Sequence, residues 1–202
     1  MTQKSIAWTT GTWTNHPVSS IEEDQFLKVE TREGSDYWEK TLYGFERSSG
    51  HSLLTDWEEG SAIEVTFELG SFTELYDQAG IMLYQGQQRW IKAGIELNDG
   101  IPQLAVVVTD GYSDWSLAPV PDWVGKNVTI RASQLQDAVI IRARTENQSW
   151  RTVRVARFPY ETGQQAGPFA CAPTRAGFQV IFTRWVSTEP DRDIHVDPPF
   201  EE

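Results

Sequence analysis

Apolar and polar residues alternate over short runs along most of the chain, and turn-forming residues separate the runs. The run 63–69 (IEVTFEL) shows the pattern most clearly, because every second residue from Ile63 onwards is apolar. Alternation of this kind is typical of β-strands with one buried face, and the apolar spacing of helices is nearly absent. Further strands are predicted at 79–84, 90–97, 103–109, 127–132, 138–145, 150–158 and 177–184.

Two of these runs, 79–84 (AGIMLY) and 90–97 (WIKAGIEL), are separated by turn residues around Gly86 and are predicted to form a hairpin. Their apolar residues occupy alternate positions and should face the core. The remaining positions share the opposite face, which we expect to be a continuous polar and aromatic surface opened by glycines. These positions are Gln78, Gly80, Met82, Tyr84, Trp90, Lys92, Gly94 and Glu96.

The spacing of strands and turns predicts the fold class. Asn98-Asp99-Gly100 is typical of a type I′ hairpin turn, and the nearly unbroken apolar run after it is typical of a central strand. Many short strands at regular spacing predict an all-β, two-sheet antiparallel jelly-roll sandwich. We expect one domain over residues 1–188, a surface loop over 159–173 and a loosely ordered, acidic, Pro-rich tail over 189–202.

Composition supports one large domain and narrows the classes of partner. The 202 residues are 39% apolar, which is enough for a sizeable core. The formal net charge is −12 and no cluster of Lys and Arg stands out, so we expect neither nucleic acid nor an anionic membrane as a partner. The first residues lack the apolar core of a signal peptide, and no long apolar run follows, so we expect a cytoplasmic protein.

Residue types that carry common chemistry are sparse. Cys171 is the single cysteine, which excludes an internal disulfide, and it has no neighbouring histidine to activate it. His16, His51 and His195 lie far apart and not in metal-ligand spacing, so we expect no metal. Glycine-rich phosphate loops and the nucleophile elbow of Ser hydrolases are absent, and no cofactor is predicted.

Four stretches carry a family resemblance: DYWEKTLYGFERSSGH (36–51), YDQAGIMLY (76–84), RWIKAGIELNDG (89–100) and VVTDGYSDWS (107–116). By their order and spacing the chain resembles the regulation of enolase family from about residue 8 to 186. It also resembles the sandwich domains appended to some bacterial xylosidases. The resemblance implies a concanavalin A-like fold of the lectin and glucanase type, whose concave face forms the groove where relatives bind sugars. Fold analogy supplies no activity.

The candidate binding site joins the polar and aromatic face to residues from the matching stretches. Aromatic rings stack on the C–H faces of sugars, while ammonium, amide and carboxylate groups bond to hydroxyls. Trp38 and Trp115 are predicted stacking platforms. The full set is Trp38, Lys40, His51, Gln78, Tyr84, Trp90, Lys92, Glu96, Asp114 and Trp115. Alternatively, these aromatic residues only pack against a covering loop, and Lys92 and Glu96 form a charge pair.

Carboxylate spacing argues against an obvious glycosidase. Such enzymes need two carboxyl groups roughly 5–5.5 Å or 6.5–9.5 Å apart. Glu64 and Glu68 lie on one strand about 13 Å apart, and we expect both to be solvated. Glu96 and Asp114 are the remaining pair that neighbouring strands could bring together.

In the run 140–157 (IIRARTENQSWRTVRVAR), four of the arginines alternate with apolar residues of two predicted strands. They are Arg142, Arg144, Arg151 and Arg154. Alternation places them away from the core, so we expect a solvated basic face opposite acidic neighbours rather than an anion site.

The sequence thus supports three functional hypotheses in decreasing order. The first is a non-catalytic domain that binds a carbohydrate or sugar-like metabolite in the concave groove. The second is a protein-interaction module that regulates a metabolic enzyme, which a contiguous exposed apolar patch or an occluded groove would favour. The third is a glycoside hydrolase or lyase that uses Glu96 and Asp114.

Overall fold

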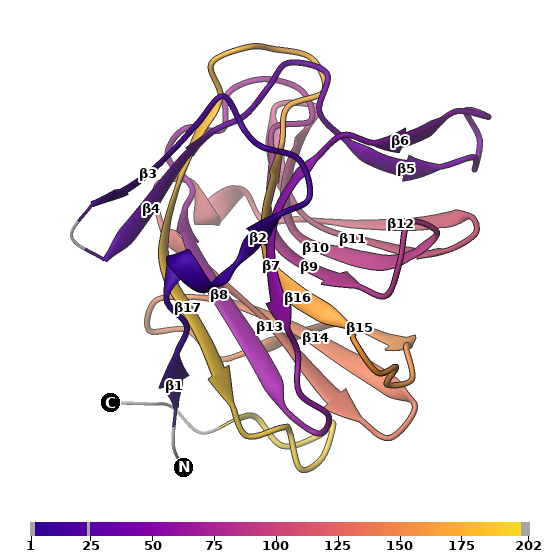
Figure 1. Ribbon diagram of the computed structural model, residues 1–202. Coiled ribbons are helices and arrows are strands. Elements are labelled where there is room, and N and C mark those ends of the chain that lie inside the picture. Colours follow the sequence, from indigo (N-terminus) through magenta and orange to yellow (C-terminus); the bar gives the residue numbers. More distant parts are fainter. Residues whose placement is uncertain (1–2, 24, 199–202) are drawn as a thin grey trace.

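Two antiparallel β-sheets packed face to face make up the protein (Figure 1). The computed structural model describes residues 3–23 and 25–198. Within these residues the helical structure consists of two short 3₁₀ turns, η1 (Trp8–Thr10) and η2 (Pro121–Trp123). The predicted all-β, jelly-roll sandwich is confirmed.

An eight-stranded sheet forms one layer. Its order is β15-β14-β13-β8-β17-β4-β3, and β1 pairs with β17. The strands are β1 (Lys4–Ser5), β3 (Ser19–Glu23), β4 (Phe26–Glu30), β8 (Ala62–Glu68), β13 (Asn127–Leu135), β14 (Ala138–Thr145), β15 (Arg151–Arg157) and β17 (Gln179–Thr188). The alternation predicted for β8 is confirmed on its inner face, because Ile63, Val65 and Phe67 are buried in the main core.

A seven-stranded sheet forms the other layer, in the order β12-β11-β10-β9-β16-β7-β2. The strands are β2 (Thr12–Trp13), β7 (His51–Asp56), β9 (Gln78–Tyr84), β10 (Arg89–Asn98), β11 (Ile101–Asp110), β12 (Ser113–Pro119) and β16 (Gln165–Cys171). Both predicted hairpins form. In the second, Asn98 pairs with Ile101, and Asp99 and Gly100 both have positive φ, as a type I′ turn requires.

One central strand was not predicted. β16 lies in the segment 159–173, which we expected to be a surface loop, and it pairs with β9 on one side and β7 on the other. β16 contains small residues and does not show the alternation of apolar and polar residues by which the other strands were predicted. At Gly167 a Cβ atom would lie 1.9 Å from the carbonyl oxygen of Leu53, so this backbone approach needs glycine.

The main core fills the space between the sheets, and a second apolar layer covers the outer face of the seven-stranded sheet. The second layer includes Met82, Trp90, Val107 and Phe169. A two-stranded ribbon, β5 (Tyr37–Glu39) and β6 (Glu46–Ser48), contributes Tyr37 and Trp38 to it and projects over this face (Figure 1). The predicted polar face is therefore largely buried beneath the ribbon.

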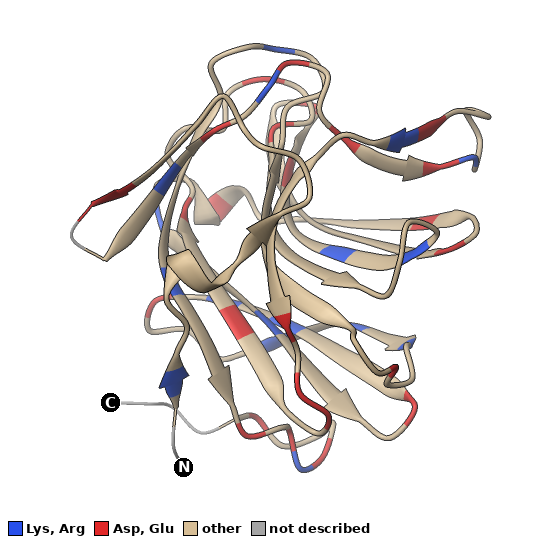
Figure 2. Cartoon of the chain, in the orientation of Figure 1, with Lys and Arg blue, Asp and Glu red and all other residues tan. Residues whose placement is uncertain are grey.

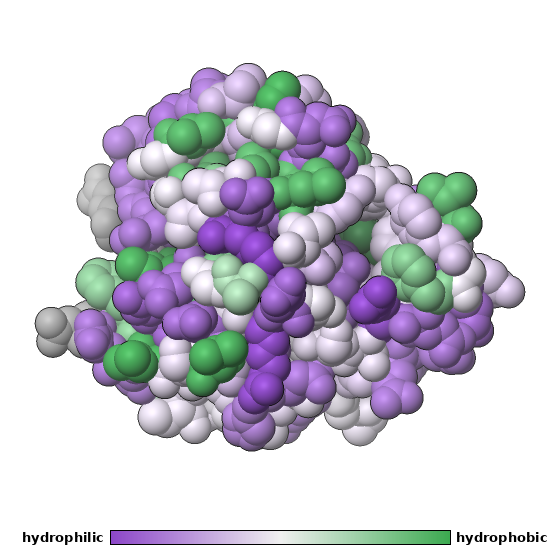
Figure 3. Space-filling model, turned by 90° about the horizontal axis from the view of Figure 1, so that it is seen from above, coloured by the Kyte–Doolittle hydropathy of each residue, from purple (hydrophilic) through white to green (hydrophobic). Residues whose placement is uncertain are grey.

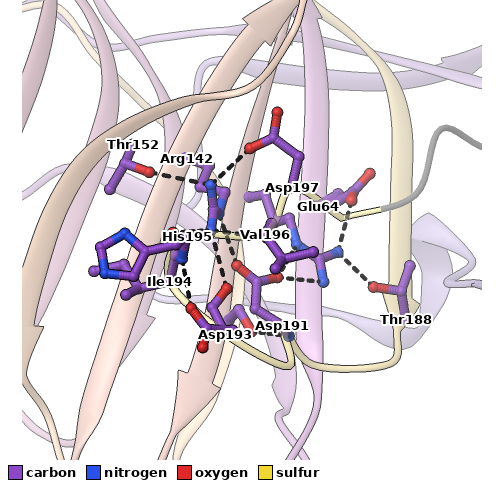
Figure 4. Close-up of polar contacts among 12 residues, drawn as sticks. Glu64, Arg142, Thr152, Thr188, Asp191, Asp193, Ile194, His195, Val196 and Asp197 are labelled. Atoms are coloured by element: carbon purple, nitrogen blue, oxygen red, sulfur yellow. Dashed lines mark hydrogen bonds and ion pairs between the residues drawn. The ribbon is translucent and has the colours of Figure 1, made fainter.

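A network of buried charges lies on the outer face of the eight-stranded sheet (Figure 4). Arg131 donates to Glu64 at 2.8 Å and to Asp191 at 2.8 Å. Arg142 donates to the other carboxylate oxygen of Asp191 at 2.8 Å. Arg184 on β17 also pairs with Glu64. The expectation that Glu64 and Arg142 are solvated is wrong, because their charges are neutralised within the protein.

The acidic segment after β17 is held on this sheet. Asp191 is only 4% exposed, and the carbonyl oxygens of Ile194 and Val196 accept hydrogen bonds from Arg142 (Figure 4). Asp197 pairs with the same guanidinium at 3.1 Å. The expected loose order is therefore wrong for residues 189–198, while residues 199–202 lie outside the described part.

Candidate functional site

A pocket of about 270 Å³ lies between the β5–β6 ribbon and the outer face of the seven-stranded sheet. Residues from three parts of the chain line it. They are Gly34, Asp36, Trp38, Tyr43, Phe45 and Arg47 from the ribbon and its flanks; Tyr76, Gln78, Lys92, Glu96, Val107 and Trp115 from the sheet strands and the segment before β9; and Pro173 and Thr174 after β16. We call this the ribbon pocket. Of the ten predicted site residues, it brings together Trp38, Gln78, Lys92, Glu96 and Trp115.

Lys92, on the sheet strand β10, lines the floor of the pocket. Its ammonium donates to Asp36 at 3.0 Å and to Gln78 at 2.8 Å. β9 and β10 place Lys92 and Gln78 on one face because both positions have the same parity in a shared register. Burial is the largest single effect and acts to lower the pKa of Lys92, but Asp36, Cys171 and Glu96 together outweigh it, so the pKa is raised.

Glu96 lies two residues beyond Gly94 on the same face and is 4% exposed. Its Oε1 atom is buried and has no hydrogen-bond partner in the described part of the chain. Burial raises the pKa of Glu96 to about 7, against an opposing effect of Lys92, and Asp36 raises it further. Glu96 is therefore a buried carboxyl group that titrates near neutral pH and whose Oε1 atom lacks a hydrogen-bond partner among the described residues.

Aromatic rings form the walls of the pocket. Trp38 meets Trp115 edge to face, with ring centroids 6.1 Å apart, and meets Tyr43 at 5.7 Å. Tyr43 stacks in turn on Phe45. Five tryptophans have a buried indole N–H without an acceptor in the described residues, and of these Trp115 is the one that lines the ribbon pocket.

Tyr84 and Trp90, two further predicted residues, line a separate polar pocket of about 150 Å³ on the same sheet face. Tyr37 lines this second pocket and fastens the ribbon there, because its hydroxyl donates to the Gly50 carbonyl at 2.6 Å. Trp90 is fully buried against Tyr37, with ring centroids 5.8 Å apart. Neither predicted residue reaches the ribbon pocket.

His51 is a structural residue rather than a member of the groove. It is fully buried, and its Nε2 accepts a hydrogen bond from the backbone N–H of Arg32 at 3.0 Å. That contact leaves the proton on Nδ1, which donates to the carbonyl oxygen of Asn15 at 3.0 Å. Burial lowers the pKa of His51, so the ring is neutral and fully bonded.

Asp114 and Lys40 also lie outside the ribbon pocket. Consecutive strand residues point to opposite faces, so Asp114 points away from the pocket that Trp115 lines; it pairs with Arg154 at 3.2 Å. In register Asp114 is level with Ile91, about 16 Å along β10 from Glu96. The predicted pair of Glu96 and Asp114 therefore does not form. Lys40 pairs with Glu46 at 3.2 Å.

Four pocket residues within the stretch 36–51 were missed from the sequence: Asp36, Tyr43, Phe45 and Arg47. They lie in the first stretch that matches the family, from which only Trp38, Lys40 and His51 had been selected. A β-hairpin pairing within this stretch would have found one of them, because Trp38 pairs directly with Arg47. The strands have three residues each, which is too short for a visible alternation.

The site residues give no support for metal or thiol chemistry. Among residues 3–23 and 25–198, no group of three or more His, Cys, Asp or Glu side chains is placed to hold a metal ion. Cys171 is buried, and burial holds the pKa of its thiol well above the usual range. In the same residues no helix has the length and apolar character to cross a membrane.

Stability should depend on pH through Glu96. Its pKa is 4.5 when unfolded and about 7 when folded, so the folded state keeps a proton that the unfolded state releases. The associated stability is fully present below pH 4.5 and is lost as the pH rises through 7, a change on the order of 3 kcal/mol. In urea unfolding at several pH values, wild type should lose stability relative to Glu96→Gln over this range. Parallel curves for the two proteins would show that the carboxyl group titrates normally.

The fold and the pocket define a class: a β-sandwich domain with a half-enclosed aromatic and charged pocket on the outer face of one sheet. The chain matches the family described as "Protein of unknown function (DUF1349)" over residues 13–190 and belongs to that family. The resemblance noted from the four sequence stretches is confirmed.

One curated relative and two solved structures are similar to the chain. It is 39% identical to "Regulation of enolase protein 1" of Saccharomyces cerevisiae over 188 residues, 93% of each chain. A crystal structure of a functionally unknown protein from the same yeast has a TM-score of 0.82 and 37% identity, covering 92% of this chain and 99% of that one. Xylan beta-1,4-xylosidase from Bacillus halodurans C-125 has a TM-score of 0.67 at 14% identity, covering 92% of this chain and 39% of that one. This last likeness shows the fold alone.

Proposed function

We propose that the protein is a non-catalytic binding domain that takes a carbohydrate or sugar-like metabolite in the ribbon pocket. The observation that carries the proposal is the unpartnered Oε1 of Glu96, in a residue 4% exposed, at the floor of an aromatic pocket. A buried polar atom without a partner costs stability, and a ligand hydroxyl would supply the missing hydrogen bond. The size and mixed lining of the pocket suit a ligand of one or two sugar rings.

The arrangement favours recognition over hydrolysis. Asp36, the other carboxylate of the pocket, is engaged by Lys92 at 3.0 Å. Asp114, the partner that a hydrolase hypothesis gave to Glu96, points away from the pocket. The carboxyl groups therefore serve to hold hydroxyls and to position Lys92.

A thermal-stability screen tests the proposal. The panel contains neutral sugars, sugar acids and sugar phosphates. A ligand at 100 times its dissociation constant contributes about 2.7 kcal/mol, or about 5–11 °C for a domain of this size. We expect a specific shift in wild type that is lost in Trp115→Phe and smaller in Glu96→Gln, whose amide oxygen still accepts a hydrogen bond. Asp114→Asn is the matched control, and it should keep the shift. An unchanged shift in all three variants would show that the ligand does not bind in the ribbon pocket.

A second candidate function rests on exposed apolar residues at the tip of the ribbon. Leu42 is 85% exposed, and Tyr43 and Phe45 are also exposed, as is Tyr112 in the nearby turn between β11 and β12. Hydrophobic side chains are visible in this projecting part of the molecule (Figure 3). Leu42 has a φ of 63°, a strained conformation that functional sites often retain.

Such a tip fits a protein-interaction module, and the name of the yeast relative points to a metabolic enzyme as partner. Size-exclusion chromatography with purified enolase tests this. Co-elution at a fixed ratio that is lost in Leu42→Asp would favour the module. Separate elution of the two proteins would count against it.

A further inference from the structure

We infer that the ribbon pocket takes a small hydroxylated anion, a sugar acid or a sugar phosphate, with its anionic group at Arg47 and its hydroxyls at Glu96 and Trp115. This inference rests on the proposed function and specifies the class of ligand. Three features carry it: an unpaired guanidinium at the rim, compensated charge at the floor, and a donor and an acceptor that lack partners.

Arg47 is directed into the site by the register of the ribbon. Residues directly opposite in an antiparallel pair lie on the same face, and Arg47 is opposite Trp38, which lines the pocket. The guanidinium lies over the ring of Phe45 at 4.9 Å, which fixes its position at the rim. Within the described chain, no carboxylate pairs with Arg47, whereas its neighbour Glu46 pairs with Lys40.

The remaining charges of the pocket compensate one another. Lys92 and Asp36 form an ion pair at 3.0 Å. Burial raises the pKa of Glu96 to about 7, which reduces its negative charge near neutral pH. Arg47 is thus the charge that the pocket leaves unbalanced, although the chain as a whole carries −12. Acidic residues are distributed over much of the molecule (Figure 2), but at physiological salt their distant charges are screened within about 8 Å.

The two unpartnered polar atoms of the pocket require hydroxyl groups on the ligand. The N–H of Trp115 needs an acceptor, and the Oε1 atom of Glu96 needs a donor when it is ionised. Hydroxyl groups supply both roles, one donating to Glu96 and another accepting from Trp115, whereas alkyl groups supply neither. The aromatic walls provide faces on which the C–H groups of a sugar ring can pack. A guanidinium binds carboxylate or phosphate with paired, charge-assisted hydrogen bonds.

Binding of an anion should couple to the proton on Glu96. Negative charge in the pocket opposes ionisation of this carboxyl group, as Asp36 already does. The titratable groups that face Glu96 are Lys92 on β10, Asp36 before β5, Tyr76 before β9 and Cys171 on β16. Affinity for an anion should therefore fall as the pH rises from 6 to 8, and this dependence should be lost in Glu96→Gln.

Calorimetry with glucose, gluconate and glucose 6-phosphate tests the inference. We expect gluconate, glucose 6-phosphate or both to bind tenfold more tightly than glucose. Which of the two anions binds more tightly distinguishes carboxylate recognition from phosphate recognition. Arg47→Ala should weaken binding of that anion about tenfold, or about 1.4 kcal/mol, and leave glucose unchanged. Arg47→Lys should recover part of the loss. Arg157→Ala, an exposed arginine on β15, is the control and should change nothing.

Gluconate is the probe for the pH series, because phosphate itself titrates near pH 6. Equal affinity for glucose and both anions, or no effect of Arg47→Ala, would overturn the inference while the proposed function stands. Failure of all three probes to bind would overturn the inference too. Failure of the wider sugar panel would then overturn the proposed function as well.

Discussion

Replacing Asp191 by alanine is expected to lower the free energy of unfolding by about 3–5 kcal/mol, although the residue lies in an acidic terminal segment. The reason is the two arginines that its carboxylate joins. Arg131 and Arg142 are 3% and 1% exposed, and each donates to Asp191 at 2.8 Å. Loss of one carboxylate leaves two buried positive charges short of their partner, which costs far more than loss of a surface pair.

Thermal and urea unfolding measure this effect directly. The expected loss corresponds to a fall in Tm on the order of 6–20 °C for a domain of this size. Asp137→Ala is the matched control, because Asp137 pairs with Arg157 at 3.8 Å and both side chains are exposed. The control should lose less than about 1 kcal/mol. Equal losses for the two variants would mean that the C-terminal segment is not held by the buried arginines.

Lys92→Met should also destabilise the protein by about 3–5 kcal/mol, and it should abolish ligand binding. The variant removes the ammonium that Asp36 and Gln78 share and leaves the Asp36 carboxylate unpaired beside Glu96. It also raises the pKa of Glu96 further, because Lys92 lowers that pKa in the wild type. The pocket would lose its shape and its charge balance together.

The double variant Lys92→Met/Asp36→Asn separates these effects. Neither charge of the pair is left alone in the double variant, so part of the stability should return while binding stays lost. Lys40→Met is a control on the ribbon, because its ion pair with Glu46 is exposed, and it should have little effect. An unchanged stability in Lys92→Met would show that the ammonium is solvated in solution and that the floor of the pocket is open.

The faces of the main strands could be predicted from the sequence because they depend on local alternation. The parity of 79–84 and 90–97 placed Gln78, Lys92 and Glu96 on one surface, and the structure puts all three in one pocket. The turn at Asp99 and Gly100 set the register of the next hairpin. The same alternation argues against one part of the predicted site. Asp114 and Trp115 are consecutive in one strand, so their side chains point to opposite faces and cannot both line the pocket.

The remaining features depend on contacts between distant parts of the chain. Glu64 and Arg142 both lie on strand faces turned away from the core, so the sequence indicated that they are exposed to solvent. In the structure, Asp191 and the segment around it cover that face of the sheet. β16 was missed because Gly167 and its small neighbours fit a crowded backbone and show no alternation. The pocket residues of the β5–β6 ribbon were missed because strands of three residues show no alternation. Their position over the sheet depends on contacts with residues far away in the sequence.

The central claim is that the ribbon pocket binds a ligand through its unpartnered polar atoms. A ¹H–¹⁵N spectrum of the full chain tests it most directly, since each of the nine tryptophans contributes one indole N–H signal. Trp115→Phe identifies the signal of Trp115. The protein is then titrated with the member of the sugar panel that stabilises it most. We expect the Trp115 signal to move as its N–H gains an acceptor. A Trp115 signal that stays in place while other signals move, or no movement with any member of the panel, would contradict the account.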